Sequence, residues 1–221
     1  MKKFTLRARE SASTLSQDLP MTRRKAPAKS APASLLERLS PQEAVEVLKQ
    51  LLEIHPELRH EAEQCATSHV SSTSVEDVAE DVQARITNID LDALNGRAGK
   101  HSWGYVEPGD AAVELLEESI EDLNDDMKRK AELGLVAVAE VVSVGIVRGL
   151  YGLRDTNSDG ALGWAPDFPG EHADYTVGEF IRACSPSTRK EARKSLLVTL
   201  VECVPEWAKG LERAADRAVR E

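Results

Sequence analysis

The sequence predicts an all-α fold, either an irregular helical bundle or a short solenoid of stacked antiparallel helix hairpins. Hydrophobic residues make up 41% of the 221 residues but aromatic residues only 4%, so the core must consist of aliphatic side chains, which suit closely packed helices. Apolar residues also recur every three or four positions in segment after segment, which is the spacing of one helix face. A chain of this length forms one large domain or two small ones.

Residues 1–34 are expected to form a disordered basic arm and linker. They hold eight basic and two acidic residues, a net charge of +6, whereas the rest of the chain carries −16. Residues 25–34 contain two prolines and no large apolar side chain, so they cannot bury enough surface to fold. Organelle transit peptides share this composition, and Met21 is an alternative translation start. Both points stay open.

The first helices are expected to form a hairpin. Ser40, Pro41 and Glu43 make a capped helix start, because the hydroxyl and the carboxylate each satisfy a free backbone amide and proline suits the first turn. Apolar residues follow at helical spacing as far as Pro56. Proline ends this helix and opens the next one, predicted at 56–68.

A third helix is predicted to begin at Ser74, with Asp77 as its capping partner, and to end near Asn88. Residues 95–109 then break the helical pattern with four glycines and a proline. Such a break predicts a functional loop or a subdomain boundary. Helix resumes near Asp110, with an aliphatic stripe on one face and a dense run of Asp and Glu on the others.

Residues 135–153 are predicted to form the central core helix. Gly145 and Gly149 lie one turn apart and remove side-chain bulk, so another helix can approach closely there. Glu140 and Arg148 interrupt this apolar stretch. Two charges within the stretch argue against a helix that spans a membrane, and no membrane partner is expected.

Residues 155–174 are predicted to form a second long loop, because they contain two prolines and no continuous apolar stripe. Three shorter helices should follow, two of them opened by proline, at 175–184, 186–203 and 205–220. The whole of 35–221 is expected to be one helical domain, with a subdivision near 95–109 as the alternative.

The three cysteines are expected to be buried, reduced thiols. Cys65, Cys184 and Cys203 are odd in number, which is not the pattern of a disulfide framework. The N-terminal residues lack the continuous apolar stretch of a secretory signal. A cytoplasmic location is therefore expected, with the transit peptide as the alternative.

A calcium loop is suggested by oxygen ligands at alternate positions. Asp155, Asn157 and Asp159, followed by Gly160, resemble the first two-thirds of an EF-hand loop. The twelfth position is Pro166, where a bidentate acid is needed. A solvated turn between helices is therefore the favoured interpretation, and calcium is the one cofactor to test.

The two long loops hold the residues expected to contact a partner. These residues are aromatic or basic on an otherwise acidic chain: Arg97, Lys100, Trp103, Tyr105, Trp164 and Phe168. Exposed aromatic side chains on loops often anchor partners. The alternative is that Trp103 and Tyr105 pack back onto the helices as a plug, which is the more common fate of such rings.

No catalytic motif is present in the sequence, and acidic residues are too abundant for any pair to be singled out as an acid and base. A non-enzymatic role is therefore favoured over an enzymatic one. The leading hypothesis is an interaction or scaffold protein that binds a protein partner through helix grooves and the aromatic loops. One alternative is a nucleic-acid-associated protein that uses the basic arm for phosphate contacts. Another is a calcium-binding helical protein built on residues 155–160.

Overall fold

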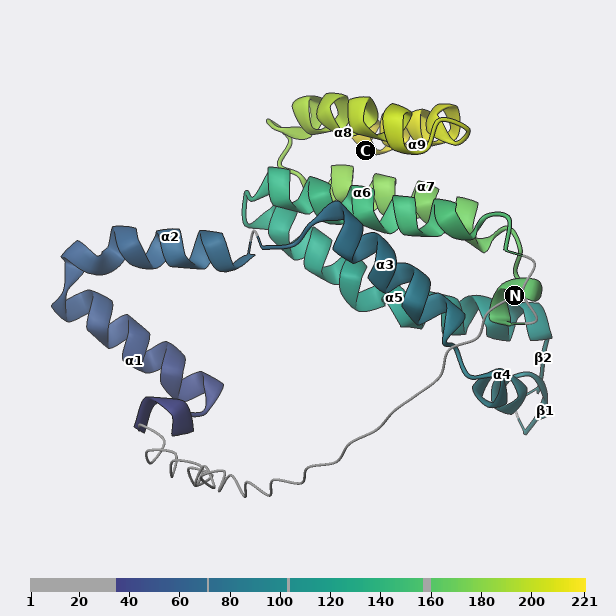
Figure 1. The fold of residues 1–221 in the computed structure, drawn as a ribbon, viewed down its shortest axis with the longest axis horizontal. Helices are drawn as coiled ribbons and strands as arrows, with labels where there is room; N and C mark the ends of the chain where they lie inside the picture. The colour runs from purple at the N-terminus through teal and green to yellow at the C-terminus, as the bar shows by residue number, and fades with distance from the viewer. Residues whose placement is uncertain (1–34, 71, 103, 157–159) are drawn as a thin grey trace, which may run out of the picture. The chain divides into compact units, whose positions relative to one another are not determined.

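The computed structural model describes residues 35–70, 72–102, 104–156 and 160–221 (Figure 1). The predicted arm, residues 1–34, lies outside the described residues. By its internal contacts the chain divides into two compact units, residues 1–59 and 60–221. Each unit is described by itself, and the predicted domain boundaries stay predictions.

The first unit is built around one capped helix. Its elements are η1 (Leu35–Arg38), α1 (Pro41–Ile54) and η2 (Pro56–Leu58). The predicted capping box is confirmed, because the Ser40 amide donates to the Glu43 carboxylate at 2.8 Å and the Glu43 amide donates to the Ser40 hydroxyl at 3.3 Å. Helix α1 ends at Ile54 and is capped by His55, immediately before Pro56, as predicted.

The second unit is helical apart from one two-stranded hairpin among its described residues. Helix α2 (Arg59–Val70) leads into it, and its further elements are α3 (Val75–Thr87), α4 (Leu91–Arg97), β1 (Gly99–His101), β2 (Gly104–Val106), α5 (Pro108–Glu132), α6 (Val136–Leu153), η3 (Ala161–Gly163), α7 (Phe168–Ala183), α8 (Arg189–Cys203) and α9 (Ala208–Arg220). The predicted all-α class is confirmed.

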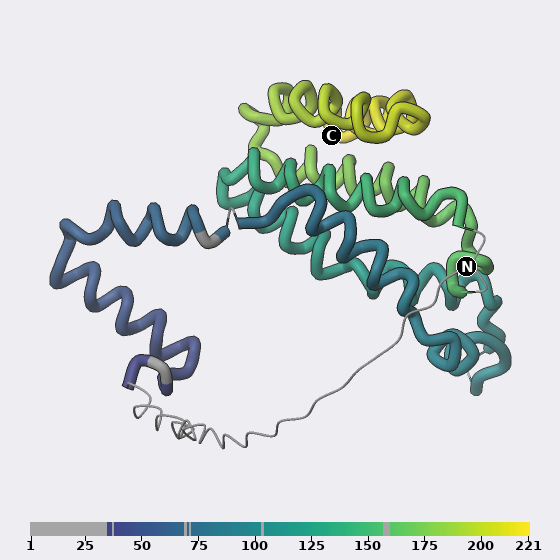
Figure 2. The backbone as a smooth tube through the Cα atoms, viewed as in Figure 1, coloured from purple at the N-terminus to yellow at the C-terminus, as the bar shows by residue number. Residues whose placement is uncertain are grey.

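Helix α6 is the centre of the second unit, where it contacts α3, α5, α7 and α8. Helix α9 packs against both α7 and α8. Figure 2 shows the layered result, with α8 and α9 over α6 and α7, and with α3 and α5 on the other side. The bulkiest fully buried side chains are aliphatic apart from one ring and one methionine: Val82, Leu116, Ile120, Met127, Val142, Ile146, Leu150, Phe180, Ile181, Leu196, Leu200 and Leu211.

Helix α6 is long and apolar enough to cross a membrane by length and composition alone, despite the two charges of its sequence. Within the structure, 56% of this helix is buried against its neighbours. Its two charges have partners at the surface: Glu140 accepts a hydrogen bond from Ser195 at 3.0 Å, and Arg148 pairs with Glu76. The expectation that no membrane partner exists stays a prediction.

Gly145 and Gly149 let α3 approach α6 closely, as their spacing predicted. A methyl group on Gly145 would lie 2.5 Å from Cβ of Val78, and one on Gly149 would lie 2.8 Å from the carbonyl oxygen of Ala79. Atoms that are not bonded cannot approach so closely, so any side chain here would push the two helices apart.

The segment 95–109, predicted as a loop, contains the end of α4 and the antiparallel hairpin of β1 and β2. Gly99 and Gly104 have positive φ angles of 99° and 149°, which glycine adopts without strain. Each strand has three residues. The alternation that signals a strand cannot be recognised over so short a stretch.

The starts of the last three helices were predicted at the wrong residues. Helix α7 begins at Phe168 rather than 175, because Pro169 occupies its first turn. Helices α8 and α9 begin three residues later than predicted, since Pro186 and Pro205 each start a turn that precedes the helix.

The cysteines are free, but one is not buried. Cys184 is buried, Cys203 is partly buried and Cys65 is exposed. Burial raises the pKa of the Cys184 thiol to about 11, so this thiol is protonated at neutral pH. The prediction of a buried Cys65 is wrong because α2 leaves nearly all of its side chains exposed.

Replacing Gly145 by alanine should lower the free energy of unfolding by about 1–3 kcal/mol, because the added methyl collides with Val78. Gly152→Ala in the same helix is the matched control, since its methyl would meet the flexible amide end of Gln83. The control should be neutral or up to about 1 kcal/mol more stable. Urea denaturation measures both variants, and equal effects would refute close packing at Gly145.

Candidate functional site

The hairpin carries two of the predicted contact residues, Lys100 and Tyr105, as directly opposed partners. The side chain of Tyr105 is 64% exposed, so it does not form the plug that was the alternative. Lys100 is exposed as well. Trp103 lies outside the described residues, and its predicted role stays a prediction.

Arg97 is held against α5. Its guanidinium donates to both carboxylate oxygens of Glu118, at 2.8 and 2.7 Å, and lies 3.6 Å from the carboxylate of Glu114. A bidentate pair of this kind fixes orientation more than it adds stability when it is open to solvent. The Arg97 hydrogen bond also holds the pKa of Glu118 below its usual range. Arg97 thus orients α4 on α5, and its predicted contact with a partner stays untested.

The second predicted loop places one ring outside and one inside. Trp164 is 56% exposed, and its carbonyl oxygen lies 3.3 Å from the place of a Cβ on Gly109. Because Gly109 lies in the first turn of α5, directly after the hairpin, Tyr105 and Trp164 lie at the same end of the second unit. Phe168 is 4% exposed, so the expectation of an exposed ring there is wrong. It begins α7, and its ring stacks on His172 with centroids 4.9 Å apart.

The predicted calcium loop is described only in part. Asp155 is exposed, and its carboxylate lies 3.4 Å from the guanidinium of Arg154. Asn157 and Asp159 lie outside the described residues. Elsewhere in the described chain, no group of three or more His, Cys, Asp or Glu side chains could hold a metal ion. Calcium binding stays a prediction.

Asn124 on α5 joins His172 and Thr176 on α7 in a buried hydrogen-bonded cluster. The Thr176 hydroxyl donates to Oδ1 of Asn124 at 3.0 Å. Nδ2 of Asn124 donates to the carbonyl of Ile120 at 3.2 Å and to Nε2 of His172 at 3.0 Å. Because an amide nitrogen can only donate, Nε2 of His172 accepts and the ring proton is on Nδ1.

The environment of His172 keeps its ring neutral. The side chain is 7% exposed, and burial lowers its pKa to about 4. Its Nε2 lone pair is already occupied by the Asn124 amide. His172 is therefore a structural group at neutral pH and offers neither a free base nor a metal ligand at Nε2.

A groove of about 340 Å³ lies over this cluster between α5 and α7. Five carboxylates of α5 line it: Glu114, Glu117, Glu118, Glu121 and Asp125. Three of them are paired within the chain, Glu114 and Glu118 with Arg97, and Asp125 with Lys128 at 2.7 Å. The remaining negative charge attracts cations to this face by its field and repels anions.

Sequence reasoning missed this buried cluster, although a signal for it exists. Asn124 continues the four-residue spacing of the buried Leu116 and Ile120 on α5. His172 and Thr176 likewise continue the spacing between Phe168 and Phe180 on α7. Polar residues at core positions of two helices indicate a shared hydrogen-bonded network. Because this helix was predicted to begin at residue 175, His172 was assigned to a loop and the spacing on α7 was not recognised.

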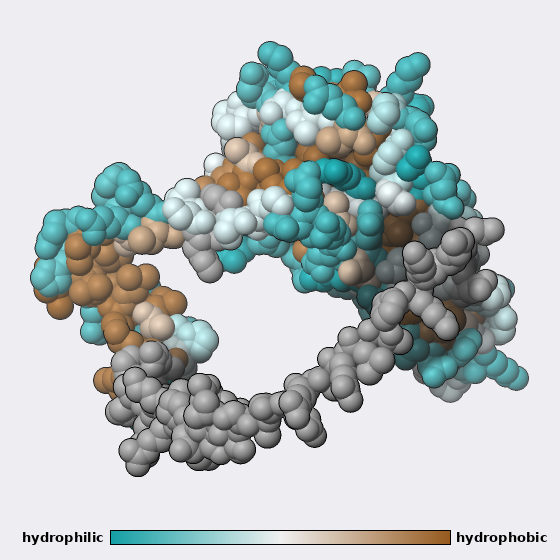
Figure 3. Space-filling model, in the orientation of Figure 1, coloured by the Kyte–Doolittle hydropathy of each residue, from teal (hydrophilic) through white to brown (hydrophobic). Residues whose placement is uncertain are grey.

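Helix α1 exposes its apolar face. Its exposed aliphatic side chains are Val45, Val47, Leu48, Leu51 and Ile54, and none of its residues is buried in the described chain. Figure 3 shows hydrophobic surface gathered over this helix. Most helices depend for stability on packing their apolar face, so α1 has an unsatisfied face.

Comparisons of the chain with protein-family models, with curated proteins and with solved structures found no significant match. The chain's own surfaces are therefore the guide to its function. Three of them are established above: the apolar face of α1, the exposed rings at one end of the second unit, and the acidic groove on α5.

The buried cluster predicts that stability depends on pH. The pKa of His172 is about 4 in the folded chain against an ordinary value of 6.5, so between these values the unfolded chain binds the extra proton. The contribution of the neutral His172 ring to the free energy of unfolding is therefore complete above pH 6.5 and is lost as the pH falls toward 4. The loss amounts to about 3 kcal/mol in all. Urea denaturation between pH 7.5 and 4.5 should show this loss, and His172→Gln should show less of it.

The control for this titration is His60→Gln. His60 is exposed on α2 and contacts Gln64 of the same helix. This variant should retain the pH dependence of the wild type. Identical pH profiles for His172→Gln and the wild type would contradict the assignment.

Proposed function

We propose that this chain is a non-enzymatic interaction protein that inserts α1 into a groove of a partner protein. The observation that carries the proposal is the exposed apolar face of α1. Soluble proteins seldom leave one contiguous apolar helix face open to water unless it binds something. Amphipathic helices dock into apolar grooves through anchors at i, i+3, i+4 and i+7. Ala44, Val47, Leu48 and Leu51 have this spacing.

The flanks of this face indicate the charge of the partner. Helix α1 carries Glu43, Glu46 and Glu53 but one basic residue, Lys49, which pairs with Glu46 at 2.9 Å. Charge complementarity favours a groove with an apolar floor and a basic rim. A second copy of α1 would bring like charges together, so pairing between copies is disfavoured.

The exposed rings of Tyr105 and Trp164 support the same function. Both side chains are exposed at one end of the second unit, Tyr105 on β2 opposite Lys100 and Trp164 in the turn after η3. Aromatic side chains contribute much of the binding energy at protein interfaces. We assign them to a second contact with a protein partner. The nucleic-acid alternative depends on residues 1–34, so no described residue favours it.

Replacing Leu48 and Leu51 together by glutamate should abolish partner binding without unfolding the chain. The two side chains are exposed, so their loss removes no buried contact. Gln42→Glu adds a charge on the side of the same helix that faces away from these two leucines and should retain binding. Affinity capture at low and high salt compares the variants. The partner that the wild-type chain captures should be released when the salt concentration is raised, because salt screens the attraction between the acidic residues of α1 and the basic rim of the partner's groove.

Three results would contradict this proposal. The first is capture that is equal for wild type and double variant. The second is a fall in melting temperature of more than about 4 °C in the double variant, which would mean that α1 packs within its own chain. The third is a dimer in sedimentation that the double variant dissociates, which would make a second copy the partner.

A further inference from the structure

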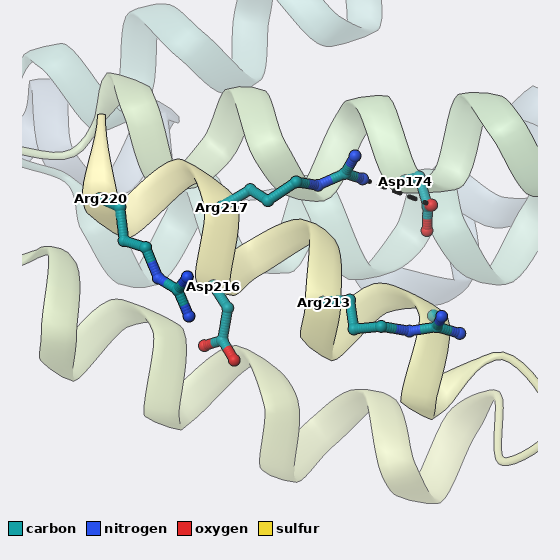
Figure 4. A pocket seen from close by; sticks show the side chains of 6 residues that line it. Asp174, Arg213, Asp216, Arg217 and Arg220 are labelled. Atoms are coloured by element: carbon teal, nitrogen blue, oxygen red, sulfur yellow. Dashed lines mark ion pairs between the residues drawn. The ribbon is translucent and has the colours of Figure 1, made fainter.

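A hollow of about 470 Å³ lies between α7 and α9 (Figure 4). Its lining is charged apart from one glycine: Asp174, Gly210, Arg213, Asp216, Arg217 and Arg220. The three arginines are four and three residues apart, which places them along one side of α9. The opposite side of α9 forms core through Leu211, Ala214, Ala215 and Ala218. The packing of their own helix thus fixes the backbone of the three arginines, and their side chains are exposed at the hollow.

The carboxylates at this end of the chain are held by arginines of other helices. Arg193 on α8 binds Glu212 at 3.4 Å and Asp216 at 2.6 Å. Arg182 on α7 binds Glu221 at 2.8 Å. These carboxylates are therefore engaged elsewhere and leave the arginines of α9 poorly neutralised.

The arginines of α9 have few partners of their own. Arg217 lies 4.0 Å from Asp174, at the outer limit of an ion pair. Arg213 donates to the carbonyl of Lys209 in its own helix at 3.1 Å. Within the described residues, Arg220 has no hydrogen bond or ion pair. Three guanidinium groups thus border one hollow with two carboxylates, of which Asp216 is paired with Arg193 and Asp174 is only weakly paired.

We propose that this hollow binds a compact ligand that carries more than one phosphate group. A guanidinium presents paired N–H donors that match two phosphate oxygens. From Arg213 to Arg220 the helix rises about 10 Å, which suits a chain of two or three phosphates better than a single one. Gly210 contributes no side chain to this hollow.

The rest of the lining excludes other ligand classes. It contains no aromatic or aliphatic side chain, so it offers no surface on which a nucleobase could stack and no pocket for the apolar anchor of a peptide. Residues 35–221 carry a net charge of −16, which repels extended polyanions such as anionic membranes and nucleic acids. A cavity of this volume is typical of small-molecule sites.

Calorimetry with sodium tripolyphosphate at low salt tests the proposal on the full chain. The wild type should bind tripolyphosphate at least about tenfold more tightly than inorganic phosphate. Arg217→Gln should weaken binding about tenfold, and the triple replacement of Arg213, Arg217 and Arg220 by glutamine should abolish it. Asp174→Asn should strengthen it several-fold, because it removes the opposing charge.

The matched control is Lys194→Gln, which removes one positive charge from an exposed position on α8 outside the hollow. It should bind like the wild type. Absence of tripolyphosphate binding, or binding that the arginine variants leave unchanged, would overturn the proposal. Equal or tighter binding of single-stranded DNA or of vesicles with anionic lipid, lost in the same triple variant, would also overturn it, since the ligand would then be an extended polyanion.

Discussion

The close contact between α3 and α6 determines how the second unit is built. With aromatic residues at 4% of the chain, the core has few large rings to fill gaps between helices. Aliphatic side chains fill a core well only when helix backbones approach closely, and Gly145 and Gly149 allow that approach. Helix α6 can then contact four other helices at once. The acidic face of α5 and the arginines of α9 lie on the outside of this packed centre.

The parts of the fold that depend on local rules could be predicted from the sequence. The cap at Ser40, the stop at Pro56 and the close approach at Gly145 each follow from the chemistry of one or two residues. The hairpin after α4 could not be predicted, because three-residue strands carry no recognisable alternation. The start of α7 was misplaced because Pro169 was interpreted as part of a loop. That error placed Phe168 on the surface.

The candidate sites show why a helical stripe alone does not reveal its role. Helices α1 and α9 both have an apolar stripe and a charged face. In α9 the stripe is buried under α7 and α8, whereas in α1 it is exposed. The exposed rings of Tyr105 and Trp164 could be anticipated as loop aromatics. The hollow between α7 and α9 could not, because it is formed by two helices that the sequence does not place side by side.

Hydrogen–deuterium exchange over the whole chain tests most directly the claim that α6 is the packed centre while α1 has an open face. The amides of α6 should exchange only through global unfolding, and those of α1 should exchange far faster, because no burial protects that helix. Addition of a captured partner should then slow exchange in α1. Equal protection of α1 and α6 in the isolated protein would contradict the account, since the apolar face of α1 would then be packed within its own chain.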